Sequence, residues 1–80
     1  MLFLLFACAE EVVQTPACAA YVACVEATDA ARGTSTDLLR FQPGGDCWGS
    51  PAGAELCDHA CDNGLVFQAK RFPSQAECQP

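Results

Sequence analysis

Cysteine is the feature that most constrains the fold of this chain. Seven of the 80 residues are cysteines, and such a content in a short chain is typical of a disulfide scaffold. A chain of this length encloses only a small core, so the conformational entropy lost on folding nearly cancels the hydrophobic gain. Disulfides make up the difference in small exported proteins. The composition therefore predicts one disulfide-rich domain that folds in an oxidising compartment.

The N-terminal stretch predicts export. Residues 1–9 read MLFLLFACA and are followed by two glutamates. This stretch is too short to cross a membrane as a helix, which takes about 20 residues, but it is typical of the end of a signal peptide. Leu5-Phe6-Ala7-Cys8 resembles the lipobox of bacterial lipoproteins, although Phe6 is bulkier than the residue usually found there. The resemblance implies cleavage before Cys8, lipidation of its thiol and attachment to a membrane.

Two other interpretations of this stretch stay open. Ala7-Cys8-Ala9 also fits ordinary signal-peptide cleavage after Ala9, which would give a freely secreted protein. Alternatively, residues 1–9 form a buried strand of the domain. Lipidation or cleavage takes Cys8 out of disulfide pairing and leaves an even number of cysteines. We expect these to form three bridges: Cys18, Cys24, Cys47, Cys57, Cys61 and Cys78.

A first helix is predicted to begin at Thr15-Pro16. Thr15 offers a capping hydroxyl, and Pro16 suits the first helical position, where no amide donor is needed. Alanine-rich sequence continues to about Ala31, and Gly33 fits the position just after a helix end. One apolar stripe follows the helical repeat: Cys18, Tyr21, Val22 and Val25.

A second helix is predicted from Ser50-Pro51 to about Arg71, before Pro73. We expect it to continue through Asn63-Gly64, although that pair is also a good helix stop. Its stripe comprises Cys57, Cys61, Leu65, Gln68 and Phe72. Residues 33–49 form an irregular centre with turn chemistry at Pro43-Gly44-Gly45-Asp46.

These elements predict an all-α fold, a small disulfide-stapled helical hairpin with two main helices and a long central loop. The predicted organisation is a signal peptide or lipobox remnant over residues 1–9, a tether over 10–14 and a disulfide-rich helical domain over 15–80.

Helix geometry restricts the disulfide pairing. Cys18 and Cys24 lie about 9 Å apart along a helix, beyond the roughly 7 Å between Cα atoms that a bridge allows. Cys57 and Cys61 have nearly parallel Cβ directions, which also disfavours a mutual bond. An antiparallel hairpin would join Cys24 to Cys57, Cys18 to Cys61 and Cys47 to Cys78. Because Cys18 and Cys24 diverge by about 120° around their helix, one of them could pair with Cys47 instead.

The cysteine spacing resembles a known group of proteins. C-x5-C is followed by GG-x-CW, then C-x3-C and a final cysteine. This order resembles small cysteine-rich lipoproteins of unassigned function from myxobacteria and their relatives, along most of the mature chain. The resemblance implies an exported bacterial protein and attaches no activity to it.

The charge balance excludes some partners. The formal net charge is −6, and only four Lys or Arg are present. Nucleic-acid binding is therefore disfavoured, because too few cations exist to neutralise phosphates. The acidity also argues against electrostatic docking on anionic lipid heads, so the predicted membrane contact is the lipid on Cys8.

The candidate chemical sites centre on His59, the single histidine. A metal site would use Cys57, His59 and Cys61 with Cys47, but His59 lies about 160° from Cys61 around the helix. A small hydrolase would use His59 with Asp58 or Asp62, and a calcium site would use Glu55 with these two aspartates. The D-x-D-x-D-G calcium loop is absent from the sequence.

The sequence accordingly predicts no catalytic, cofactor or metal site, and it predicts that Trp48 covers the disulfide core rather than stacking on a sugar or a partner. The predicted function is a non-enzymatic, lipid-anchored interaction or structural module of the bacterial envelope, at the outer membrane or periplasmic face. The alternative is a freely secreted effector or toxin-like binder, and a hydrolase using His59 is a distant third.

Overall fold

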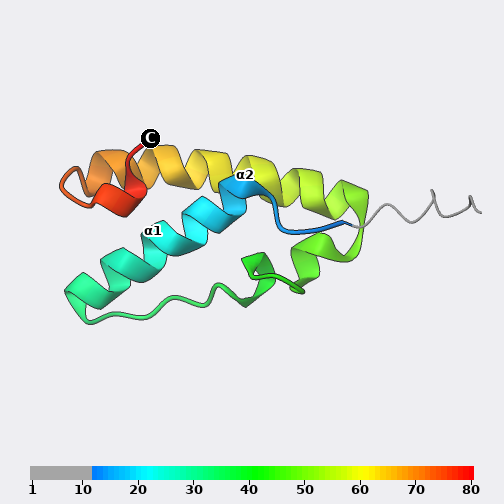
Figure 1. Cartoon of the computed structure of the whole chain (residues 1–80), viewed down its shortest axis with the longest axis horizontal. Coiled ribbons are helices and arrows are strands. Elements are labelled where there is room, and N and C mark those ends of the chain that lie inside the picture. Colours follow the sequence, from blue (N-terminus) through cyan, green and yellow to red (C-terminus); the bar gives the residue numbers. More distant parts are fainter. Residues whose placement is uncertain (1–11) are drawn as a thin grey trace, which may run out of the picture.

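The computed structural model describes residues 12–80 (Figure 1). The predictions for residues 1–9, including lipidation of Cys8, lie outside the described residues. Two main helices are present, α1 (Pro16–Arg32) and α2 (Pro51–Arg71), with three short 3-10 turns, η2 (Leu39–Phe41), η3 (Asp46–Gly49) and η4 (Ala76–Cys78). No strand occurs within residues 12–80. The predicted all-α class, with two main helices stapled by three disulfides, is confirmed.

The ends of α1 follow from local chemistry. The backbone N–H of Cys18 donates to the Thr15 hydroxyl at 3.3 Å, which caps the first turn. The helix ends at Arg32 because Gly33 adopts a left-handed conformation with φ 69°, and its N–H donates to the Asp29 carbonyl. The predicted stripe faces the core, with Tyr21 half-buried and its other members buried.

Helix α2 is continuous across Asn63-Gly64, as predicted. The Gly53 N–H donates to the Ser50 hydroxyl at 3.0 Å, which caps its first turn. A glycine inside a helix costs about 1 kcal/mol relative to alanine, but Gly64 permits a close helix contact. A Cβ at this position would lie 2.6 Å from Cε1 of Tyr21. The contact with Tyr21 therefore explains why a helix-breaking residue lies in mid-helix.

The two helices run in the same direction (Figure 1). Three contacts join the helices in order: Cys18 is bonded to Cys61, Tyr21 packs on Gly64, and the Arg32 guanidinium lies over the Phe72 ring. Residue numbers therefore increase in the same direction along both helices. The antiparallel arrangement used to predict the pairing is therefore wrong. The connection between the helices, residues 33–50, spans up to about 60 Å when extended. Since α1 is only about 26 Å long, this segment returns along its whole length.

The parallel arrangement changes the disulfide pairing. Cys18 is bonded to Cys61, as the hairpin predicted, and neither of the two rejected pairs forms. The predicted Cys24–Cys57 and Cys47–Cys78 pairs are wrong, and neither helical cysteine of α1 takes Cys47. Instead, η4 folds back between the C-terminal halves of the helices (Figure 1), where Cys78 meets Cys24. Cys47 lies in η3, directly before α2, and bonds Cys57 in the second turn of that helix.

The core is small and rich in sulfur. Within residues 12–80, the largest side chains that are fully buried are all cysteines, namely Cys18, Cys24 and Cys61. Trp48 is also buried, as predicted, and its indole N–H donates to the Gln42 carbonyl at 3.0 Å. The remaining buried apolar residues are Val22, Val25, Leu38, Phe41, Cys47 and Cys78. Covalent bridges thus occupy much of the volume that aliphatic side chains fill in larger domains.

Candidate functional site

The three disulfides cross-link the two main helices to each other and to two of the 3-10 turns. One bridge joins α1 to α2, one joins α1 to η4, and one joins η3 to α2. Residues 33–45, between the end of α1 and η3, contain no cysteine. This return segment is therefore positioned by packing and hydrogen bonds, and together with α1 it lines a surface hollow.

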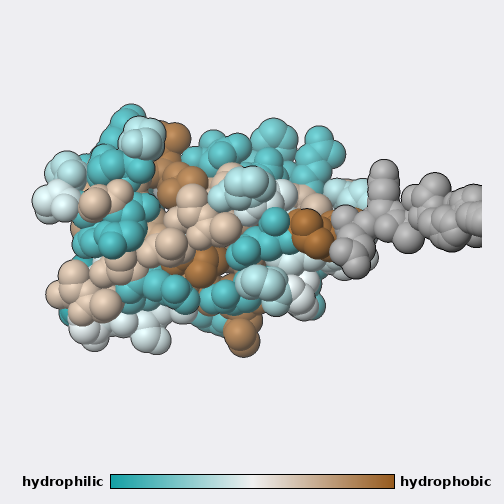
Figure 2. Space-filling view, viewed as in Figure 1, coloured by the Kyte–Doolittle hydropathy of each residue, from teal (hydrophilic) through white to brown (hydrophobic). Residues whose placement is uncertain are grey.

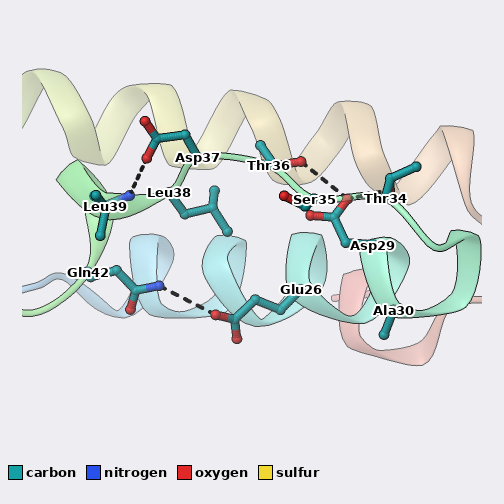
Figure 3. A pocket seen from close by; sticks show the side chains of 10 residues that line it. All are labelled: Glu26, Asp29, Ala30, Thr34, Ser35, Thr36, Asp37, Leu38, Leu39 and Gln42. Atoms are coloured by element: carbon teal, nitrogen blue, oxygen red, sulfur yellow. Dashed lines mark hydrogen bonds between the residues drawn. The ribbon is translucent and has the colours of Figure 1, made fainter.

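The first hollow lies between α1 and the return segment (Figure 3). It has a volume of about 470 Å³, and several of its polar side chains bond to one another. Asp29 Oδ1 accepts from the hydroxyls of Thr34 and Thr36 at 2.8 and 3.2 Å. Glu26 accepts from the Gln42 amide at 3.4 Å, and Asp37 accepts from the Leu39 N–H at 3.1 Å. The Asp29 and Glu26 carboxylates thus hold the return segment along α1, whereas the Asp37 carboxylate caps a turn within the segment.

A second hollow is apolar and lies where η4 meets the helices. It has a volume of about 540 Å³ and is lined by Ala20, Leu65, Val66, Ala69, Lys70, Glu77, Cys78, Gln79 and Pro80. Only Lys70 and Glu77 bring charge to it. The Gln75 amide donates to the Glu77 carboxylate at 2.7 Å, and this bond, with one to the Glu77 backbone, lowers the pKa of that carboxyl. Glu77 therefore stays ionised to lower pH than an unbonded glutamate.

The residues that a hydrolase would use lie along the solvent side of α2. His59 and Asp62 are exposed, and Asp58 is half-buried. Cys61 points from the same helix into the core, where it meets Cys18. Within residues 12–80, no group of three or more His, Cys, Asp or Glu side chains is placed to hold a metal ion.

Three of the cysteines considered as metal ligands have another role. Cys47 and Cys57 are bonded to each other, and Cys61 is bonded to Cys18. A metal needs the free thiolate, which a disulfide sulfur cannot provide. The oxidised protein therefore uses these sulfurs as cross-links.

Sequence reasoning missed the close backbone contacts that determine the tertiary arrangement. Gly64 and Tyr21 form the helix contact, and Gly45 lies so close to the carbonyls of Leu39 and Arg40 that a Cβ there would overlap them. The double glycine of the turn was a visible signal for Gly45. Nothing local distinguished Gly64 from a helix stop.

The segment before α1 lies against the domain. Val12 packs against the core cluster, and the Gln14 amide donates to the Phe41 carbonyl at 2.9 Å. The described part of the predicted tether is thus attached to the domain. Among residues 12–80, neither main helix combines the length and apolar character needed to cross a membrane.

No protein family, curated protein or solved structure matches this chain.

Proposed function

We propose that this protein is an exported, non-enzymatic module of the bacterial cell envelope that is anchored to a membrane by a lipid on Cys8. The observation that carries the proposal is the frame of three disulfides, which join elements from both ends of the domain. Thiols stay reduced in the cytoplasm of ordinary cells, whereas the periplasm and cell surface are oxidising. The disulfide frame therefore supports export.

The lipid anchor is supported by the lipobox-like Leu5-Phe6-Ala7-Cys8 and by the geometry that follows it. Val12 packs on the domain, so only four residue steps separate Cys8 from it. Four steps span at most about 14 Å. A lipid on Cys8 would therefore hold the domain close to the membrane surface.

The sequence spacing also resembles myxobacterial cysteine-rich lipoproteins, which supports the same assignment. The hydrolase alternative has less support, because His59 is exposed and borders none of the hollows described above. A histidine base is useful only where a substrate can be held beside it.

Intact-mass spectrometry of the native product tests the proposal. We expect a chain that begins at Cys8 and carries a diacylglyceryl or triacyl mass, and we expect Cys8→Ser to abolish that mass. Reduction should add the mass of six hydrogens, two for each bridge. A product whose cysteines are alkylated without prior reduction would contradict export.

Free secretion is the second candidate, and Ala7-Cys8-Ala9 favours it. The same measurement separates the two. A chain that begins at Glu10, found in the medium without any lipid mass, would replace the anchored module by a secreted binder.

A further inference from the structure

The Cys47–Cys57 bridge differs from the other two bridges in its exposure. Of the six cysteines in residues 12–80, five are at most 3% exposed, whereas Cys57 is only half-buried. Thiol–disulfide exchange begins when a thiolate attacks one of the two sulfurs of a bridge, so its rate depends on access to that bridge. Cys57 is therefore the cysteine at which an external thiol meets the least protection.

A third hollow of the surface leads to this bridge. It has a volume of about 320 Å³, and both Cys47 and Cys57 line it. The other lining residues are Arg40, Phe41, Asp46, Gly53, Leu56 and Ala60. Cys78 lines the apolar hollow described above, but Cys78 is only 3% exposed and its partner Cys24 is fully buried. The third hollow thus gives access to both residues of one bridge.

The fold depends less on this bridge than on the other two. Cys47 and Cys57 are 10 residues apart, whereas the other bridges span 43 and 54 residues. A bridge that closes a shorter loop restricts the unfolded chain less, so its loss costs less stability. Hydrogen bonds also hold the adjoining chain in place: the Gly53 N–H donates to the Ser50 hydroxyl, and the Trp48 indole donates to the Gln42 carbonyl. The remaining two bridges still join α1 to α2 and to η4.

We propose that the Cys47–Cys57 bridge is a thiol–disulfide exchange site for small-molecule thiols, and that it opens while the other two bridges keep the domain folded. A thiolate attacks Sγ of Cys57 and forms a mixed disulfide with it, the Cys47–Cys57 bond breaks, and Cys47 leaves as a thiolate that takes a proton from water. A second thiolate attacks the mixed disulfide and displaces the Cys57 thiolate, which is protonated in turn. Two thiols are thereby oxidised to one disulfide, and the bridge gains two electrons.

The dimensions of the hollow favour a small thiol over a protein partner. Its volume suits a small molecule, and Arg40 and Asp46 bring one charge of each sign to it, so its net charge does not exclude a thiolate. On the face seen in Figure 2, hydrophobic side chains form small patches separated by hydrophilic ones, so that face offers no broad apolar surface for a protein. The inference goes beyond the proposed export and anchoring, and it stands whether or not Cys8 carries a lipid.

Partial reduction of the native, exported protein tests the inference. Iodoacetamide first blocks any free thiol, 2-mercaptoethanol is then added at increasing concentration, and N-ethylmaleimide finally labels the thiols that it releases. Peptide masses locate each label. We expect Cys47 and Cys57 to be labelled, or Cys57 to carry the 2-mercaptoethanol mass, at thiol concentrations at least about tenfold lower than those that open the other bridges. Helical circular dichroism should be retained at this stage.

Ala60 allows the route of attack to be tested. Helical side chains lean toward the N-terminus of their helix, so a longer side chain at position 60 extends toward Cys57, three residues before it. Because Ala60 lines the hollow, Ala60→Leu should fill part of it and slow the exchange severalfold. Ala31→Leu is the matched control, since Ala31 is exposed on α1 and does not line this hollow. It should leave the rate unchanged.

Four outcomes would overturn the exchange site. The first is the simultaneous opening of all three bridges, and the second is the earlier opening of another bridge. The third is a loss of helical circular dichroism as Cys47–Cys57 opens, and the fourth is an equal rate in Ala60→Leu and Ala31→Leu. A failure of the proposed export is distinguishable, because the bridged cysteines would then react with iodoacetamide before any thiol is added.

Discussion

Gly64 illustrates how one residue can serve the tertiary structure at the expense of its own helix. Helix propensity favours alanine over glycine by about 1 kcal/mol. The Tyr21 ring, however, occupies the space in which a Cβ would lie, and it packs edge-on against Phe41 with ring centroids 5.5 Å apart. The aromatic contact, which joins both helices to the return segment, therefore outweighs the lower helix propensity of glycine at this position.

Gly64→Ala is accordingly expected to destabilise the oxidised protein by about 1–3 kcal/mol, the usual cost of overpacking, despite the better helix propensity of alanine. Denaturant unfolding followed by circular dichroism measures this change. In a Tyr21→Ala background the clash is absent, so the same substitution should become neutral or stabilising. A stabilising effect in the presence of Tyr21 would show that the two helices do not approach as described.

At the scale of elements, η4 packs between the C-terminal halves of the two helices (Figure 1). It contacts both helices where they separate, and Cys78 attaches it to α1. The Cys24–Cys78 bridge spans 54 residues, whereas Cys47–Cys57 spans 10. The first bridge therefore restricts the unfolded chain more strongly, and it also fixes an element that buries little apolar surface of its own.

Removing the two bridges separately should reveal this difference. We expect Cys24→Ser with Cys78→Ser to cost about 3–4 kcal/mol, and Cys47→Ser with Cys57→Ser to cost about 2–3 kcal/mol. Denaturation of the two oxidised double variants gives the comparison. Hydrogen exchange in the first variant should rise at residues 72–80 before it rises in α2. Equal losses, or protection retained at those residues, would contradict the role assigned to η4.

At the scale of the whole molecule, parallel helices bring two like macrodipole ends together. Both C-terminal ends lie at one end of the domain (Figure 1), where three of the four basic residues also lie: Arg32, Lys70 and Arg71. Cations near helix C-termini are stabilising. Arg32 and Arg71 also lie 5.4 and 5.3 Å from the Phe72 ring centroid, which adds cation–π attraction. Charge and covalent bridges together allow the unfavourable parallel alignment.

The whole domain should depend on its bridges. Among residues 12–80, ten apolar side chains are buried, and five of them are cysteines. Three bridges contribute about 6–12 kcal/mol, which is comparable to the total stability of about 5–15 kcal/mol that a domain has. We therefore expect reductant to unfold the protein at 25 °C, as measured by loss of helical circular dichroism. Zinc should not restore the fold of the reduced chain; a zinc-dependent recovery would point to metal-bound thiolates instead.

The sequence by itself determined the features that depend on neighbouring residues. Thr15, Ser50 and Gly33 set helix ends through local hydrogen bonds and backbone conformation, and the apolar stripes identified the core-facing sides of both helices. Cysteine content determined that three bridges hold the domain, and helix geometry excluded the pairs within one helix. These inferences required no knowledge of where distant segments lie.

Only the tertiary structure decided the helix direction, two of the three bridges and the role of Gly64. Each depends on the path of the return segment, which is held by contacts between residues far apart in sequence, such as Gln14 with Phe41. The chain is long enough at residues 33–50 to allow either helix direction, so its length alone carries no preference.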